Sequence, residues 1–143
     1  MVLYAKDIVE KEFLSLPPNL SVLDAAKAMA RVHQGFAVIS LADAKPVGIV
    51  TEWDLLSKVV AAARDPAHVH LEDIMTRPLV FVNANDGIDR VAELMAEKGT
   101  RRVLVEKDGK VLGVIRVQTI LGRMKEYLDS ISAQIARAQM PLF

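Results

Sequence analysis

The residues best suited to chemistry lie in the segment from Gly48 to Asp54, where a short apolar run meets a polar one. The apolar run predicts a strand, and Thr51 then stands where a helix begins. The free N–H groups of a helix's first turn favour a phosphate, and the Thr51 hydroxyl adds a hydrogen-bonding group there. Asp54 lies one turn further along, so its carboxylate can accept hydrogen bonds at the same spot. The alternative is that Thr51 only caps the helix and Asp54 only favours its first turn.

A second group with binding chemistry is the basic pair Arg101 and Arg102. Neighbouring residues of a strand point to opposite faces, so one of the two can face a ligand while the other faces solvent or a partner. A hydrogen bond from arginine to phosphate is charge-assisted and contributes about 1.5–3 kcal/mol. The alternative is a solvated basic pair, which contributes little.

The composition argues against several classes of function. Lys plus Arg and Asp plus Glu number 18 each, so no overall positive charge attracts nucleic acid or an anionic membrane. The chain has no cysteine, and His68 and His70 lack a third ligand nearby in sequence, so we expect no disulfide and no metal site. We recognise no nucleophile beside a base, no carboxylate cluster for Mg²⁺ and no glycine-rich phosphate loop. We therefore expect neither an enzyme nor a required cofactor.

Two features of the sequence bear on its location. The longest apolar runs, such as residues 59–63, are far shorter than the roughly 20 residues that span a bilayer. The first residues lack the basic stretch and the apolar run of a signal peptide. Both features predict a cytoplasmic protein without a membrane segment.

The elements that must position these residues occur twice in the chain. Similar residues recur 66 positions apart, and after a predicted hairpin the interval becomes 65. The recurring positions are Asp7-Ile8 with Asp73-Ile74, Ala26 with Ala92, Met29 with Met95, and Gly48-Ile49-Val50 with Gly113-Val114-Ile115. The lost residue falls in the turn of the hairpin, where a deletion costs least. The chain is therefore a tandem repeat, with its boundary near residues 65–70.

Each copy predicts the order strand, helix, strand, strand, helix. In the first copy these elements are residues 13–16, a helix capped by Ser21 and running through Val32, residues 36–39, residues 47–50, and a helix from 52 to about 63. In the second copy they are residues 80–82, a helix over 88–98 capped by Asp86 and ended by Gly99, a hairpin turning at Asp108-Gly109, and a last helix from Val117. We expect an α/β fold of the α+β kind, in which residues 1–66 and 67–125 pack about a pseudo-twofold axis and residues 126–143 form a helical extension.

This repeated order, with the segment from Gly48 to Asp54 at a strand-to-helix junction, resembles the CBS (cystathionine β-synthase) domain family over about residues 6–125. The resemblance is to stand-alone CBS pairs of prokaryotic or archaeal type, and it implies a disc-like Bateman module with an adenine nucleotide in a cleft between the copies. It implies that Asp54 accepts both ribose hydroxyls, that residues 77–80 contact adenine and that residues 99–103 contact phosphate. The implied site residues are Ile49, Val50, Thr51, Asp54, Pro78, Leu79, Val80, Arg101 and Arg102, with Arg116 as a further candidate for the phosphate.

The equivalent second cleft lacks nearly every polar group of the first. Arg116 replaces Thr51, Thr119 replaces Asp54, Gly35 and Phe36 replace Arg101 and Arg102, and Glu12 replaces Pro78. We therefore expect this cleft to hold no ribonucleotide. Arg116 can fill the cleft, pair with Glu12 or reach the phosphate in the first cleft, and the sequence does not choose among these.

The resemblance implies a regulatory module that senses energy or metabolite state. Only one or two arginines and a helix terminus supply positive charge, which favours AMP or ADP over ATP and leaves ATP as a further candidate. S-adenosylmethionine stays an alternative ligand because it shares adenine and ribose, and a ligand-free module for protein or nucleic-acid interaction stays an alternative function. CBS pairs generally form dimers, and one apolar seam favours a homodimer, although it can also pack on its own chain. The seam comprises Leu121, Met124, Leu128, Ile131 and Ile135. The sequence does not identify the regulated protein partner.

Overall fold

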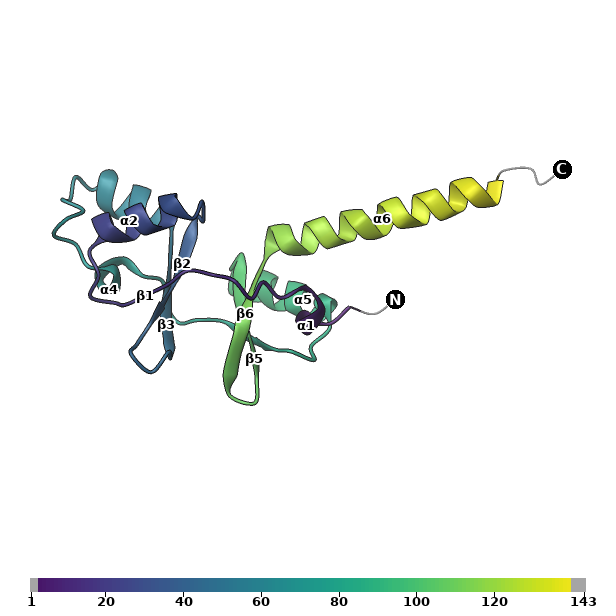
Figure 1. Cartoon of the computed structure of the whole chain (residues 1–143), viewed down its shortest axis with the longest axis horizontal. Helices are drawn as coiled ribbons and strands as arrows, with labels where there is room; N and C mark the ends of the chain where they lie inside the picture. Colours follow the sequence, from purple (N-terminus) through teal and green to yellow (C-terminus); the bar gives the residue numbers. More distant parts are fainter. Residues whose placement is uncertain (1–2, 140–143) are drawn as a thin grey trace. The chain divides into compact units, whose positions relative to one another are not determined.

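The computed structural model describes residues 3–139, which form two compact units (Figure 1). Residues 12–79 form the central unit, and residues 3–11 together with residues 80–139 form the terminal unit. Each unit contains one three-stranded sheet and its own helices.

The central unit has the strand order β1-β2-β3, with β1 parallel to β2 and β2 antiparallel to β3. Its elements are β1 (Ser15–Leu16), α2 (Val22–Arg31), β2 (Phe36–Ser40), β3 (Pro46–Thr51), α3 (Glu52–Leu55), the π-helical turn η1 (Leu56–Val60) and α4 (Leu71–Ile74). The first strand is shorter than predicted because the Leu14 N–H donates to Oε1 of Gln34, at 2.7 Å, instead of to a neighbouring strand. The end of β3 leads directly into α3, which fixes the position of the polar residues at this junction.

The terminal unit repeats this topology, with β4 parallel to β5 and β5 antiparallel to β6. Its elements are α1 (Ala5–Ile8), β4 (Phe81–Asn83), α5 (Ile88–Lys98), β5 (Arg102–Lys107), β6 (Lys110–Arg116) and α6 (Val117–Gln139). The β5–β6 hairpin turns at Asp108 and Gly109, both with positive φ, as the sequence predicts. The tandem repeat and the α+β class are therefore confirmed.

The leading segment of each repeat pairs with the sheet of the other repeat. Bridges join Tyr4 to Gly87 and Glu10 to Val114 in the terminal unit, and the equivalent bridges join His70 to Ser21 and Thr76 to Ile49 in the central unit. The one-turn helices α1 and α4, which the sequence pattern did not predict, lie within these segments. The compact units and the sequence repeats 1–66 and 67–125 consequently divide the chain at different places.

Helix termini show where local sequence signals hold and where they fail. Ser21 caps α2 as predicted, because its hydroxyl accepts the Asp24 N–H at 3.1 Å. The predicted cap of α5 at Asp86 is wrong: α5 begins after Gly87, and the Asp86 carboxylate instead accepts the Asn83 N–H at 2.8 Å. At its other end α5 stops at Gly99, whose φ of 62° is left-handed, as predicted.

Each unit has an apolar core on the helix side of its sheet. In the central unit the core joins α2, η1 and α4 to the strands through Val22, Ala25, Met29, Ala37, Ile39, Val50, Val59, Val69, Leu71 and Ile74. In the terminal unit it joins α1, α5 and the start of α6 to the strands through Ala5, Ile8, Val82, Ala84, Val91, Met95, Val103, Val105, Ile115 and Ile120. The leading segments thus supply core residues, and not only sheet bridges.

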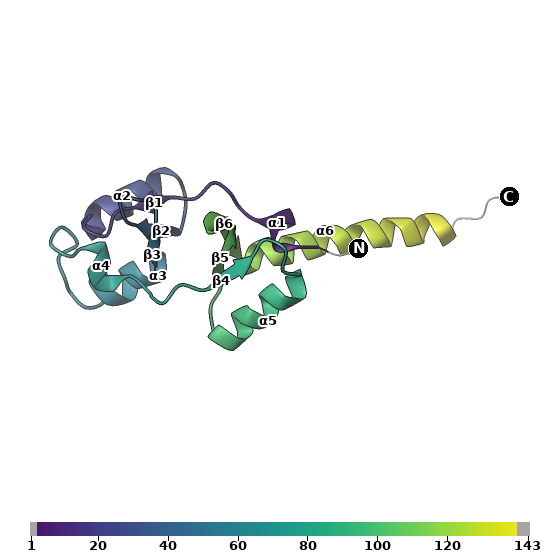
Figure 2. The same ribbon diagram turned by 90° about the horizontal axis from the view of Figure 1, so that it is seen from below.

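Helix α6 follows β6 without a break and extends beyond the sheet of the terminal unit (Figures 1 and 2). It is continuous from Val117 to Gln139, so no boundary is visible at residue 126, and residues 140–143 of the expected extension lie outside the described residues. Within residues 3–139, α6 included, no helix has both the length and the apolar composition needed to cross a bilayer.

Candidate functional site

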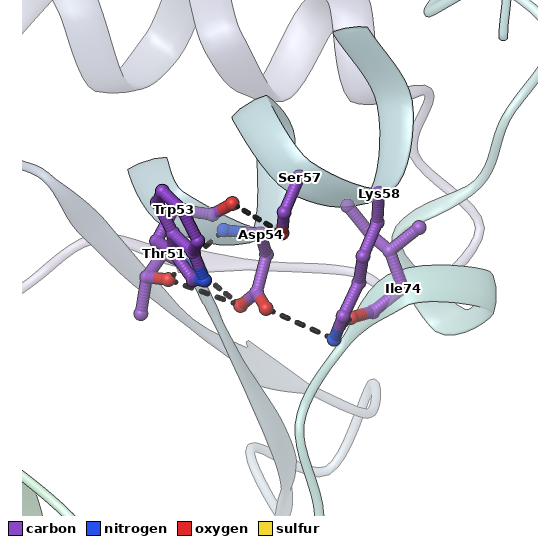
Figure 3. A network of polar contacts seen from close by, with 6 residues as sticks. All are labelled: Thr51, Trp53, Asp54, Ser57, Lys58 and Ile74. Carbon is purple, nitrogen blue, oxygen red and sulfur yellow. Dashed lines mark hydrogen bonds and ion pairs between the residues drawn. The ribbon is translucent and has the colours of Figure 1, made fainter. Parts of the chain in front are cut away.

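The junction between β3 and α3 brings Thr51 and Asp54 together (Figure 3). The Thr51 backbone N–H donates to Oδ2 of Asp54 at 2.9 Å, and the Thr51 hydroxyl donates to the same oxygen at 3.1 Å. The Asp54 N–H lies 3.2 Å from the Thr51 hydroxyl oxygen, which completes a reciprocal cap. The capping role that the sequence offered as an alternative is therefore present in the structure.

Asp54 is a buried acid, with 5% of its surface exposed. A buried carboxylate needs a compensating charge, and Lys58 supplies it: its Nζ lies 2.9 Å from Oδ1 of Asp54. The same ammonium donates to the carbonyl oxygen of Ile74, the last residue of α4, at 2.8 Å. Lys58 thereby connects the Thr51–Asp54 junction to the end of α4.

The helix after the motif differs from the predicted one over residues 52–63. It has a single α-helical turn, α3, and continues as the π-helical turn η1, in which the Ala61 N–H donates to the Leu56 carbonyl at 2.8 Å. The Ser57 hydroxyl donates to the Trp53 carbonyl oxygen at 2.7 Å and so occupies an acceptor of the regular helix ladder. Lys58 lies in this π-helical turn, a feature that often occurs at functional sites.

The acceptor capacity of Asp54 decides what the junction can bind. Each carboxylate oxygen has two lone pairs. Oδ2 accepts two hydrogen bonds from Thr51, whereas Oδ1 accepts only from Lys58 among the contacts of residues 3–139. Asp54 can therefore accept one more donor at Oδ1 in this geometry, and a second only if the Thr51 hydroxyl turns elsewhere.

The remaining implied site residues divide between the two units. Ile49 and Val50 are buried on β3, next to Thr51, and Pro78 and Leu79 lie at the end of the same central unit. Val80, Arg101, Arg102 and Arg116 belong to the terminal unit. The structure thus brings Ile49, Val50, Thr51 and Asp54 together at one junction, and places the basic candidates on the other unit.

The basic pair stands at the start of β5. Arg101 is exposed and precedes the strand, and Arg102, its first residue, is half-buried. The Thr100 hydroxyl stabilises the start of β5, because it donates to the Arg102 carbonyl at 2.9 Å and accepts the Arg102 N–H at 3.3 Å. The Arg101 carbonyl in turn accepts the Val117 N–H at 3.0 Å, which holds the start of α6 beside the pair.

The equivalent junction in the terminal unit has a different arrangement. Arg116 donates from Nε and Nη2 to the two carboxylate oxygens of Glu10, at 3.1 and 2.9 Å, and the Thr119 hydroxyl donates to Oε1 of the same residue. Of the three roles left open for Arg116, a pair with Glu12 is therefore corrected to a pair with Glu10. The acid at this junction comes from the leading segment and is engaged by a bidentate arginine, which leaves it poorly suited to accept a diol.

Sequence reasoning missed two polar residues of these junctions, Lys58 and Glu10. Lys58 follows Asp54 by four residues on a predicted helix, a spacing that favours an ion pair and could have indicated it. Glu10 is the counterpart of Thr76 in the repeat, but only the exchange of leading segments brings it to Arg116. No local signal in the sequence reports that exchange.

Comparison with known proteins gives consistent matches. A family model described as the CBS domain matches residues 5–61 and 71–126. An uncharacterized protein of Methanopyrus kandleri is 31% identical over 123 residues, which are 85% of this chain and 62% of that protein. A homoserine O-acetyltransferase of Methanohalobium evestigatum is 29% identical over 125 residues, which are 87% of this chain and 24% of the enzyme. The chain thus spans less than two thirds of the length of both relatives.

Solved structures agree with the family model. The hexameric CBS-CP12 protein from bloom-forming cyanobacteria has a TM-score of 0.77 and 34% identity, with coverage of 85% of this chain and 67% of that one. The CBS domain pair of protein MJ0100, solved in complex with methylthioadenosine and S-adenosyl-L-methionine, has a TM-score of 0.78 and 26% identity, with coverage of 89% and 99%. Since the family model matches most of the chain in two tandem copies, and both units share one topology, the chain belongs to the CBS domain family and carries a CBS pair.

Proposed function

We propose that this CBS pair is a regulatory module that binds an adenosine ligand, AMP or ADP, at the Asp54 junction and catalyses no reaction. The observation that carries the proposal is the buried Asp54 carboxylate, which is held at a strand-to-helix junction and keeps acceptor capacity at Oδ1. Burial of a carboxylate costs free energy. An exposed aspartate would cap the helix equally well, so capping alone does not account for the burial of Asp54. Asp54 is thus suited to accept a ribose hydroxyl.

Other candidate residues have side chains of the kinds that such a ligand needs. The apolar side chains of Pro78, Leu79 and Val80 suit a purine, and the guanidinium groups of Arg101 and Arg102 suit a phosphate. The CBS pair of MJ0100 was solved with two ligands that contain adenosine, so adenosine is the chemistry that those ligands share with AMP. The arginines favour a phosphorylated ligand here over S-adenosylmethionine, which is the second candidate.

Regulation requires that the ligand bind two states of the module, or of a complex with a partner, with different affinity. No partner is identified by the chain itself, and a ligand-free interaction module is the alternative that the test below addresses. A cytoplasmic location is part of this proposal.

The direct test is calorimetric titration of AMP, ADP, ATP and S-adenosylmethionine into the purified chain. We expect one site per chain for AMP or ADP, with a dissociation constant near micromolar, or about −8 kcal/mol. Asp54→Ala should weaken binding at least about 100-fold, because a charge-assisted hydrogen bond and the geometry of the capped junction are lost. Trp53, the only tryptophan, is 67% exposed beside Asp54 and gives a fluorescence signal for the same titration.

Asp7→Ala is the matched control for the test of Asp54. Asp7 is also an acid that caps a short helix, since its Oδ2 accepts the Tyr4 N–H at 2.8 Å, and it belongs to the terminal unit. We expect this variant to bind AMP like the wild type. Absence of heat with every ligand, or equal binding by Asp54→Ala and the wild type, would contradict the proposal and redirect the search to a macromolecular partner.

We further propose that α6 pairs with a second copy of the chain along its apolar seam. Four seam residues are more than half exposed: Leu121, Met124, Leu128 and Ile135. Their alternating spacing of three and four residues suits knobs-into-holes packing against a helix with the same seam, and a second copy provides that helix. The alternative, that the seam packs on its own chain, is disfavoured by this exposure.

Leu128→Glu should therefore raise the dissociation constant of the dimer at least about tenfold, because it places a charge among apolar contacts. Light scattering during gel filtration over a range of concentrations measures the change. Ala133→Glu, which alters an exposed α6 position outside the seam, should leave the mass unchanged. A monomeric wild type, or an assembly that tolerates Leu128→Glu, would contradict the proposed pairing.

A further inference from the structure

Lys58 lies where it can contact the same ligand atom as Asp54. Its Nζ is 2.9 Å from Oδ1 of Asp54, and its side chain is 43% exposed, compared with 7% for that of Asp54 (Figure 3). Lys58 is thus the more solvent-accessible residue of the pair. A ligand that reaches Oδ1 of Asp54 must approach beside the ammonium.

The unused hydrogen-bonding capacity of the pair matches a hydroxyl group. An ammonium has three N–H donors, and the contacts of Lys58 within residues 3–139 use two of them, one to Asp54 and one to the Ile74 carbonyl. Oδ1 of Asp54 has one lone pair left, as counted above. One free donor and one free acceptor therefore stand 2.9 Å apart, and a hydroxyl is the common group that donates and accepts at a single atom.

We propose that Lys58 is a binding residue that recognises, together with Asp54, one ribose hydroxyl of the ligand. The hydroxyl donates to Oδ1 of Asp54 and accepts from Nζ of Lys58, so the three polar atoms form a closed triangle of hydrogen bonds. This inference rests on the proposed function and adds a selectivity to it. A deoxyribose analogue leaves both a donor and an acceptor without a partner, so the site discriminates against it strongly.

Lys58 also anchors α4 through the Ile74 carbonyl, so a purely structural role must be distinguished from ligand contact. If Lys58 has only a structural role, Lys58→Met should lower the affinity for every adenosine ligand by the same factor, because all of them contact the displaced Asp54. A contact to the hydroxyl predicts that AMP loses affinity while the analogue that lacks this hydroxyl loses little. The ratio of the two affinities is therefore the informative quantity.

The experiment compares AMP with 2′-deoxy-AMP and 3′-deoxy-AMP on the wild type, Lys58→Met and Lys58→Arg, by calorimetry and by Trp53 fluorescence. We expect the wild type to prefer AMP over one of the two analogues about 100-fold, since two charge-assisted bonds are lost. In Lys58→Met the preference should fall to about tenfold or less. Lys58→Arg keeps charge and donors and should retain the larger part of it.

The outcomes separate this inference from the proposed function. If AMP binds the wild type and the preference is equal in Lys58→Met, the proposed role of Lys58 is wrong while the adenosine site stands. If AMP does not bind the wild type, the proposed function fails and the inference fails with it. Thermal melting of the Lys58 variants verifies that they fold, and Lys58→Leu, whose side chain likewise has no N–H donor, replaces Lys58→Met if that variant does not fold.

Discussion

Replacement of Gly113 by alanine is expected to destabilise the terminal unit by roughly 3 kcal/mol or more. A Cβ at this position would lie 2.1 Å from the carbonyl oxygen of Glu10, far inside the contact distance. The clash is with backbone that has little freedom to move, because Glu10 and Val114 exchange two hydrogen bonds of 2.9 and 3.0 Å. Urea unfolding followed by circular dichroism would show the loss as a lower transition midpoint.

Gly48→Ala is the matched comparison, because Gly48 is the counterpart of Gly113 in the repeat. There the nearest atom to the added Cβ is Sδ of Met75, at 2.6 Å, followed by other atoms of the same side chain. Methionine is flexible and can move aside, so we expect a cost of only about 1 kcal/mol. An equal cost at both glycines would show that the leading segment at Glu10 moves more freely than its hydrogen bonds indicate.

The two glycines mark where the exchanged leading segments enter the sheets, and this exchange makes the two junctions unequal. In the terminal unit the exchange places the Glu10 carboxylate beside Arg116 and Thr119. Glu10 therefore already accepts hydrogen bonds from the side chains of both residues. In the central unit the exchange delivers Thr76, and the acid of the junction is Asp54 on its own helix. This asymmetry favours the proposal of a single adenosine site per chain.

The sheets, the hairpins and most helices could be predicted because their signals are local. The strand and helix periodicities of the two copies reinforce each other, and residues such as Asp108 and Gly109 determine a turn by their own conformational preferences. The motif residues Thr51 and Asp54 were found for the same reason, since capping chemistry depends on a spacing of three residues. Turns and caps of this kind depend on residues close together in the chain, so they can be predicted from the sequence.

The exchange of leading segments and the environment of Asp54 could not be predicted, because both depend on contacts between distant residues. The helices α1 and α4 have one turn each, too short for a hydrophobic period, although Asp7 and Asp73 accept the N–H groups of Tyr4 and His70 and thus give a cap signal. The contact of Lys58 with the Ile74 carbonyl likewise joins residues 16 positions apart. The sequence therefore indicates Asp54 as a candidate binding residue, but not which neighbours occupy its lone pairs.

Leu71→Ala is expected to destabilise the central unit by about 3 kcal/mol, since Leu71 is fully buried and its truncation leaves a cavity. Leu71 is the first residue of α4, and its N–H donates to the Leu20 carbonyl at 3.0 Å. Leu23→Ala, a truncation at a leucine that is 36% exposed in the same unit, should cost about 1 kcal/mol or less. Equal unfolding midpoints for the two variants would contradict the packing described for α4.

Truncation of Leu71 should also weaken AMP binding at the candidate site. Ile74, at the other end of α4, accepts the hydrogen bond from Lys58, and Lys58 balances the charge of Asp54. A loosened α4 removes one of the two contacts that fix the ammonium, so AMP should raise the melting temperature of Leu71→Ala by less than that of Leu23→Ala. The comparison at a fixed AMP concentration measures this difference. An equal rise in both variants would show that the Asp54–Lys58 pair keeps its geometry without support from α4.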